Sequence, residues 1–277
     1  MSCIFDQTDM TRIHLHQVDS TNSALRESLA DSTSEQMIGE PGQEPMALPE
    51  YFTVTARYQT AGRGQRGNSW ESEEGKNLLM STLLRPEFLP VSDQFRLSQV
   101  VSLAAVETLE KLAPEEKFTV KWPNDIYHGD RKICGMLLEN DLSGDHLVHT
   151  IVGIGWNINQ EEFHSDAPNP CSLIQIIGEE THVDTVLSIF FSRLKKLYAR
   201  LQSSYASGES SDWLDALYAA RLYRGDGAYY DFRDSDGPFR ASIRRVNPDG
   251  RLYLCRQDGT ERGYYFKEVE YLLPAHL

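Results

Sequence analysis

The most informative stretch of the chain is Gly62-Arg63-Gly64-Gln65-Arg66-Gly67-Asn68-Ser69-Trp70. It follows an alternating segment, residues 51–58, that predicts a β-strand. The glycines let the backbone curl and approach a ligand closely, and consecutive amides in such a curl can form an anion-binding nest. The arginines add permanent charge suited to phosphate or carboxylate. The stretch therefore predicts an anion-binding loop, although a basic hairpin tip in solvent would have the same composition.

A second segment, Lys121-Trp122-Pro123-Asn124-Asp125, ends a strand predicted from Phe118. Pro123 has no N–H for a strand ladder, so we expect the chain to turn there. The turn would place Lys121 near a strand end. A basic start, Arg131-Lys132, then leads into another apolar strand. A single lysine is usually a solvated surface charge. Here the sequence also contains the glycine loop and Trp70, and the combination favours a functional site.

Composition bounds the class of protein. The 277 residues are 40% hydrophobic and 25% charged, as in ordinary globular proteins, and no apolar run is long enough to span a bilayer. The net charge of −14 disfavours general nucleic-acid binding, which needs neutralised phosphates. The N-terminus lacks the pattern of a secretory signal. Cysteines at 3, 134, 171 and 255 are widely spaced, so we expect reduced thiols in a cytoplasmic protein.

The hydrophobic pattern divides the chain into a mixed region and an all-β tail. In the first part we expect strands at 13–18, 51–58, 77–84, 118–121, 134–140 and 146–156. We expect helices after Asp19 or Ser20, from an Asp93 cap through Leu109, and at 183–202 and 212–222. Polar residues 31–49 predict a long loop. From Arg224 onward, short strands at 229–232, 239–246, 252–257 and 264–269 alternate with Asp-Gly turns.

Five segments occur in the order in which biotin protein ligases carry them, and the resemblance extends from about Ile13 to the C-terminus. They are Asp19-Ser20-Thr21-Asn22, the 62–70 loop, Lys121-Trp122-Pro123-Asn124-Asp125, Lys132-Ile133-Cys134-Gly135 and Gly153-Ile154-Gly155-Trp156-Asn157-Ile158-Asn159. The resemblance implies an α+β fold in which a mixed or antiparallel sheet carries a class II synthetase-like catalytic domain over 1–222. It also implies a small SH3-like barrel over 223–277.

The resemblance implies ATP-dependent biotinylation of a lysine on a biotin carboxyl carrier protein, through biotinyl-5′-AMP and with release of pyrophosphate. ATP and biotin are the implied ligands, and Mg²⁺ would arrive with ATP, bound mostly by phosphate oxygens and water. We therefore expect no metal site built from protein groups, no membrane partner and no DNA partner. Some family members carry an N-terminal DNA-binding domain, and only a dozen residues precede the first expected strand. A homodimer is left open.

The resemblance also assigns roles to residues. The implied biotin-binding residues are Ser20, Thr21, Asn22, Gln59, Arg63, Gly64, Gln65, Lys121, Gly153 and Gly155. The implied nucleotide-binding residues are Arg63, Arg66, Trp70 (stacked on adenine), Asn124, Lys132 and Asn157. The implied catalytic residues are Lys121, which would bridge the biotin carboxylate and the α-phosphate, Arg66, Lys132, and Asp125, which would orient or deprotonate the acceptor amine.

The loop departs from the commonest family pattern at two positions. Many members carry a third arginine where Gln65 stands and another basic residue where Asn68 stands. We therefore expect fewer cations to hold the adenylate, and a leakier intermediate.

Two other classes of function stay open. A lipoate-type ligase would share fold and chemistry, although the Trp-Pro-Asn-Asp segment favours biotin. A non-catalytic peptide- or ligand-binding module is disfavoured by the acidic composition and the lysines. His14 and His16 alternate on one expected strand, but a pair without a third ligand is more typical of an ordinary strand than of a metal site.

Overall fold

The computed structural model describes residues 3–5, 10–33, 47–165, 167 and 169–273. By its internal contacts the chain forms two compact units, residues 1–87 with 133–191 and residues 88–132 with 192–277. The predicted loop at 31–49 lies largely outside the described residues, although Asp31 to Thr33 continue a helix. The predicted domain boundary between 222 and 223 stays a prediction.

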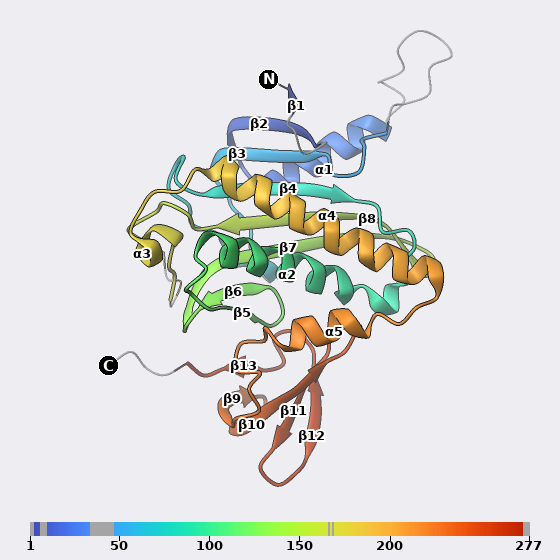
Figure 1. Ribbon diagram of the computed structural model, residues 1–277, viewed down its shortest axis with the longest axis vertical. Coiled ribbons are helices and arrows are strands. Elements are labelled where there is room, and N and C mark those ends of the chain that lie inside the picture. Colours follow the sequence, from blue (N-terminus) through green and yellow to red (C-terminus); the bar gives the residue numbers. More distant parts are fainter. Residues whose placement is uncertain (1–2, 6–9, 34–46, 166, 168, 274–277) are drawn as a thin grey trace. The chain divides into compact units, whose positions relative to one another are not determined.

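The first unit is built on a mixed β-sheet (Figure 1). Its strands follow the order β1 (Cys3–Phe5), β2 (Thr11–Val18), β3 (Thr53–Gln59), β4 (Leu78–Leu84), β8 (His146–Trp156) and β7 (Arg131–Ser143). β2 and β3 pair in parallel, because α1 (Thr21–Thr33) connects them, and the other neighbours pair antiparallel. The predicted mixed α+β class is therefore confirmed, and Gly144, with φ 61°, turns the predicted β7–β8 hairpin.

One face of α1 packs on this sheet through an apolar cluster. Leu25 is fully buried and lies with Leu29 among residues of β3, β4, β8 and the segment before β3, namely Phe52, Val54, Leu83 and Ile151. Elsewhere in the unit, Trp156 of β8 meets Phe190 of α4 edge to face, with ring centroids 6.0 Å apart. The cluster fixes the start of α1, and with it Thr21 and Asn22, against the middle of the sheet.

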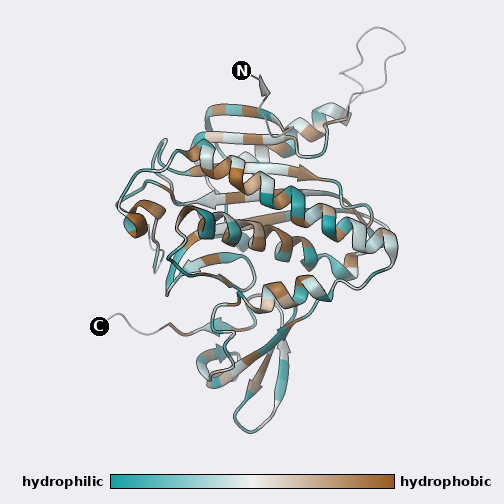
Figure 2. Ribbon diagram, in the orientation of Figure 1, coloured by the Kyte–Doolittle hydropathy of each residue, from teal (hydrophilic) through white to brown (hydrophobic). Residues whose placement is uncertain are grey.

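The second unit holds α2 (Phe95–Leu112), the hairpin of β5 (Phe118–Lys121) and β6 (Asp125–His128), and α5 (Asp212–Ala219). α4 (Val183–Ser207) begins in the first unit and ends here. Polar residues alternate with the apolar residues along α2 in Figure 2, yet most of the helix is buried. The chain then forms β9 (Tyr230–Asp234), β10 (Gly237–Val246), β11 (Leu252–Arg256), β12 (Glu261–Tyr264) and β13 (Glu270–Tyr271).

The C-terminal strands make an antiparallel sheet in the order β12-β11-β10-β9-β13. Phe232 is fully buried and packs beside Phe239 and Tyr271, with ring centroids 6.0 and 5.0 Å away. The Trp122 indole donates a hydrogen bond of 2.9 Å to the carbonyl of Gly250, which ties the β5–β6 turn to this sheet. The all-β character expected after Arg224 is therefore confirmed.

Several sequence expectations were wrong in detail. Asp93 does not cap α2: it ends a short 3₁₀ turn (η3, Val91–Asp93), Gln94 is the cap residue, and the Asp93 carboxylate accepts a hydrogen bond from Tyr205 instead. The strand expected at 264–269 does not form, because β12 ends at Tyr264 and β13 begins only at Glu270. The predicted helix 212–222 ends at Ala219. The pattern missed β1, β6, β13 and α3 (Leu173–Ile177), all five residues or shorter.

Truncating Leu25 to alanine should lower the free energy of unfolding by about 2–5 kcal/mol, because the mutation leaves a cavity under α1 that the sheet cannot fill. Arg26→Ala is the matched control on the same helix. Its side chain is 42% exposed and pairs with Asp141, so we expect a loss of less than about 1 kcal/mol. Denaturant unfolding of both variants measures the difference, and equal losses would contradict this view of the core.

Candidate functional site

The glycine loop of the first unit is a tightly closed hairpin. Arg63 and Ser69 form an antiparallel bridge, and the amide of Gly64 donates to the carbonyl of Asn68 at 2.6 Å. A short 3₁₀ turn (η2, Gln65–Gly67) forms its tip, where Gly67 has φ 88°. A Cβ on Gly62 would lie 2.7 Å from the Trp70 carbonyl oxygen. The glycines are therefore required by this turn, which argues against a shapeless basic tip. The side chain of Arg66 lies outside the described part of the structure.

Buried polar side chains meet where α1 begins. Ser20, Thr21 and Asn22 are each at most 4% exposed. Gln59, at the end of β3, accepts hydrogen bonds through Oε1 from the Thr21 amide at 2.7 Å and lies 3.1 Å from the Thr21 hydroxyl. Ser81 of β4 lies 2.8 Å from the Thr21 hydroxyl and 2.6 Å from Oδ1 of Asn22. These groups form one continuous, buried polar network.

Glu139 of β7 joins this network to the glycine loop. Its Oε2 atom accepts a hydrogen bond of 2.8 Å from Nδ2 of Asn22 and lies 3.3 Å from Nη2 of Arg63. Since a carboxylate can only accept, Asn22 must turn its NH₂ group to Glu139 and its carbonyl oxygen to Ser81. The orientation of the Asn22 amide is therefore fixed by its neighbours.

Gly153 and Gly155 of β8 are required by close neighbours. A Cβ on Gly153 would lie 2.1 Å from Oδ1 of Asn22, and one on Gly155 would lie 2.3 Å from Cε2 of Trp70. The bare backbone of β8 is thus covered by an amide and an indole of the same unit. The Trp70 ring rests on Gly155 in this structure; stacking of this ring on adenine stays a prediction.

Asn157, directly after β8, is 3% exposed. Its Nδ2 atom donates to the carbonyl of Cys171 at 3.0 Å, and its Oδ1 atom is buried without a hydrogen-bond partner among the described residues. A buried carbonyl oxygen without a donor is costly, so Asn157 retains the capacity to accept one bond.

Lys121 is the last residue of β5 in the second unit, as its sequence predicted. Its ammonium lies 5.1 Å from the ring centroid of Tyr127 and 5.4 Å from that of Tyr271. Burial lowers the pKa of Lys121, and the opposing charge of Asp125 only partly compensates. The aromatic faces stabilise the cation but accept no ordinary hydrogen bond from it.

Asp125 and Lys132 form an ion pair in the same unit. Their charged atoms are 2.7 Å apart, with side chains 18% and 30% exposed. Asp125 also faces Lys121 across the β5–β6 pair. Asn124, between the strands, is 9% exposed. The second unit therefore brings Lys121, Asn124 and Asp125 to one hairpin, with Lys132 at the start of β7 paired to Asp125. In the first unit, the predicted residues Thr21, Asn22 and Gln59 share one polar network.

Sequence reasoning missed four residues of these two clusters. Ser81 had a signal, because it is a polar residue inside the apolar run Leu78 to Leu84. Glu139 also gave a signal, because it follows the apolar stretch of the expected strand 134–140. Lys132, just before this strand, had already been assigned to the site. Tyr127 and Tyr271 gave no signal, because their approach to Lys121 depends on how β6 and β13 pack.

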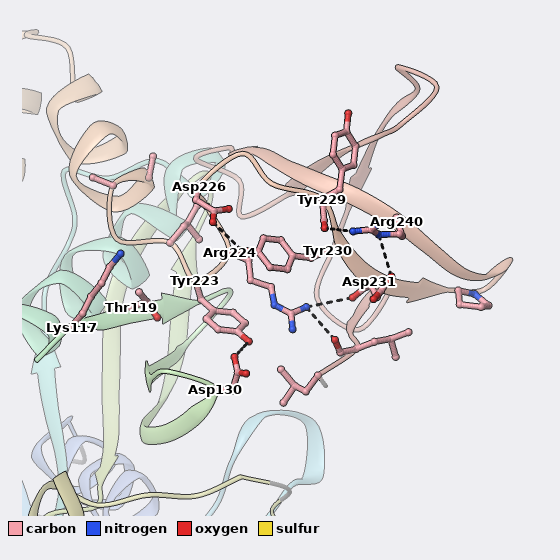
Figure 3. Close-up of a pocket in the computed structure, with 17 residues that line it drawn as sticks. Lys117, Thr119, Asp130, Tyr223, Arg224, Asp226, Tyr229, Tyr230, Asp231 and Arg240 are labelled. Carbon is pink, nitrogen blue, oxygen red and sulfur yellow. Dashed lines mark hydrogen bonds and ion pairs between the residues drawn. The ribbon is translucent and has the colours of Figure 1, made fainter. Parts of the chain in front are cut away.

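A groove of about 820 Å³ opens in the second unit beside the C-terminal sheet (Figure 3). Most charged groups on its wall bond to one another. The pairs include Arg240 with Asp231 at 3.5 Å, Tyr230 with Asp226 at 2.8 Å, and Tyr223 with Asp130. Many polar groups of the groove wall are therefore already paired with other groups of the wall.

The described residues contain no group of three His, Cys, Asp or Glu side chains placed to hold a metal ion. Cys134, Cys171 and Cys255 are free thiols. In the described part of the chain, none of the helices combines the length and the apolar character that a membrane crossing needs.

Comparison with known proteins agrees with this geometry. The model of the biotin/lipoate A/B protein ligase family matches residues 31–157. The chain is 30% identical over 221 residues to the bifunctional ligase/repressor BirA of Bacillus subtilis, covering 78% of this chain and 65% of that protein. It is 33% identical over 153 residues to the biotin–[acetyl-CoA-carboxylase] ligase of Paracoccus denitrificans, covering 54% of this chain and 62% of that one.

The match therefore spans less than two thirds of the length of either relative. Among solved structures, the biotin protein ligase from Aquifex aeolicus in complex with biotin and ATP superposes with a TM-score of 0.72 at 25% identity, covering 94% of this chain and 99% of that one. With this shared fold and the ordered sequence segments, the chain is similar to the biotin protein ligases, and part of it matches the biotin/lipoate A/B protein ligase family.

Proposed function

We propose that this protein is an enzyme, a biotin protein ligase that uses ATP to attach biotin to a lysine of a biotin carboxyl carrier domain. The biotin carboxylate would attack the α-phosphate of ATP and release pyrophosphate. The acceptor amine would then attack the acyl carbon of biotinyl-5′-AMP, lose a proton and release AMP. No protein nucleophile is needed, since each step joins two bound reactants.

The observation that carries the proposal is a surplus of hydrogen-bond acceptors where α1 begins. Three oxygen–oxygen contacts, Gln59–Thr21, Thr21–Ser81 and Ser81–Asn22, share the protons of only two hydroxyl groups. The amide oxygens at both ends have no proton, because the Thr21 amide and Glu139 fix their orientation. One contact therefore always lacks a proton, which leaves an oxygen of the network able to accept a hydrogen bond from a ligand with N–H donors, such as the ureido ring of biotin.

The cations of the proposed mechanism address the repulsion between two anionic reactants. Lys121 is assigned to bridge the biotin carboxylate and the α-phosphate, which the cost of burying its charge without an anion supports. Arg63, Arg66 and Lys132 are assigned to bind the negatively charged phosphates. Gly64 and Gln65 are assigned to the part of the loop that closes over biotinyl-5′-AMP. Remaining assignments follow the resemblance: biotin to Ser20, Gly153 and Gly155, nucleotide to Trp70, Asn124 and Asn157.

Asp125 is assigned to the acceptor amine. Its ion pair with Lys132 supports a second function, because it holds the Lys132 ammonium at a fixed distance from the end of β5. Mg²⁺ would be bound chiefly by the phosphates of ATP and by water.

We further infer that the catalytic part has the class II synthetase-like fold, and that the C-terminal sheet is an SH3-like barrel. Short antiparallel strands with β13 beside β9 support the barrel. A carrier-protein partner, a homodimer and a cytoplasmic location stay predictions. The family model covers lipoate ligases as well as biotin ligases, so it does not separate the two alternatives. The relatives compared above are a ligase/repressor and a biotin ligase by name, and neither is named as a lipoate ligase.

The proposal is tested by pyrophosphate exchange into ATP, which requires the first half-reaction only. We expect exchange that depends on biotin and is absent with lipoate. Lys121→Ala should reduce the rate by about 10²–10³-fold without unfolding the protein, because it removes one preorganised donor from the charged transition state. Lys117→Ala, an exposed lysine before the same strand, is the matched control and should keep full activity. A folded Lys121→Ala protein with full activity would remove Lys121 from the mechanism.

The pH dependence of exchange should report the titration of Lys121. Burial lowers its pKa, so the ammonium is lost at a lower pH than that of an exposed lysine. The rate should therefore be sustained below this pKa and fall as the pH rises through it. Lys121→Arg retains its charge at alkaline pH and should lose this decline while keeping some activity. Identical alkaline profiles in the two proteins would count against the assignment.

Retention of the intermediate should depend on Gln65. A Gln65→Arg variant restores the cation that many relatives have, and we expect biotinyl-5′-AMP to dissociate from it about two- to fivefold more slowly, the effect of one partly exposed charge. Stopped-flow dissociation into excess biotin measures the rate, with Gln65→Lys as a second charged variant. Unchanged dissociation in both variants would show that the loop charge does not limit retention.

A further inference from the structure

Glu139 connects two segments of the first unit that are far apart in sequence. One carboxylate oxygen accepts from the buried amide of Asn22 at 2.8 Å and lies 3.3 Å from the guanidinium of Arg63. The Asn22 end of this link is 3% exposed, whereas the side chain of Arg63 is 43% exposed. Glu139 is thus held at α1 by a buried hydrogen bond to Asn22. Its contact with Arg63 of the loop is exposed to water and is the weaker of the two.

The contact between Glu139 and Arg63 has an intermediate strength. A partly exposed ion pair at this distance biases a conformation without locking it. The loop is itself closed into a hairpin by two backbone hydrogen bonds, from Gly64 to Asn68 and from Trp70 to Gly62. Fixing Arg63 therefore fixes the whole hairpin, and an anion arriving at Arg63 would compete directly with the Glu139 carboxylate.

We propose that Glu139 is a positioning residue. It holds Arg63, and with it the glycine loop, beside the start of α1 before a ligand binds, and an anionic ligand then displaces it from the guanidinium. The inference rests on the proposed function, since the biotin carboxylate and the adenylate phosphate are the anions concerned. The negative charge of Glu139 orders the loop in the unliganded protein. It also lowers the affinity of Arg63 for an anionic ligand, because the ligand must displace the Glu139 carboxylate.

Amide hydrogen exchange of the unliganded protein tests the first part. Glu139→Gln keeps the size of the side chain and an acceptor for Asn22 but removes the charge. Exchange across residues 62–70 should accelerate about two- to fivefold in this variant. The matched control is Asp141→Asn, which removes the same charge two residues along β7 but pairs with Arg26 of α1 at 3.1 Å. Unchanged loop exchange in Glu139→Gln, or equal acceleration in Asp141→Asn, would overturn the proposal.

Calorimetric binding of biotin and of biotinol, in which an alcohol replaces the carboxylate, tests the competition. The ratio of biotin to biotinol affinity should rise about two- to fivefold in Glu139→Gln and stay constant in Asp141→Asn. A ratio that is constant in both variants would overturn the proposal, because Glu139 would then be a structural contact only. If the wild-type protein binds neither compound, the proposed function fails, whereas loop exchange still decides the role of Glu139.

Discussion

The amide of Asn22 lies between three strands of the first unit, and the arrangement of its neighbours follows from that position. It accepts from Ser81 of β4, donates to Glu139 of β7 and touches the backbone of β8 so closely that position 153 must be glycine. An amide with both ends satisfied cannot rotate, so it sets the direction of the polar groups around it. The apolar contacts of Leu25 with the sheet hold the helix that carries it.

The second unit depends on a different constraint, the cost of burying a charge. Lys121 is held against the faces of Tyr127 and Tyr271, which favour a cation but accept no ordinary hydrogen bond from it. Burial consequently destabilises the charged form and lowers its pKa. An anionic reactant would remove this penalty. The neighbouring Asp125 forms an ion pair with Lys132, and its charge offsets only part of the cost of burying Lys121.

The long elements were predictable because their patterns are unambiguous. The periodicity of residues 95–109 and the alternation in 146–156 predict one kind of structure each, and both formed close to their expected bounds. Short elements such as α3 and β13 were missed, since five residues or fewer carry little pattern and form through tertiary contacts. The Asp93 cap failed because Tyr205, more than a hundred residues later, takes its carboxylate.

The candidate site was predictable in its residue types but not in its pairings. Family resemblance singled out Thr21, Gln59 and Lys121, and the structure adds which atoms face one another. The links through Ser81 and Glu139 depend on strand order β4-β8-β7, which the sequence does not determine locally. Likewise, the resemblance assigned Gly155 to a ligand, whereas its immediate neighbour in the structure is the Trp70 ring.

The most direct test of the account is to incubate the purified protein with biotin and MgATP without an acceptor and to analyse the bound fraction by mass spectrometry. The acceptor-rich network and the half-buried Lys121 predict biotinyl-5′-AMP bound to the protein, with pyrophosphate released. Recovery of unreacted biotin and ATP, with no acyl-adenylate formed, would contradict the account.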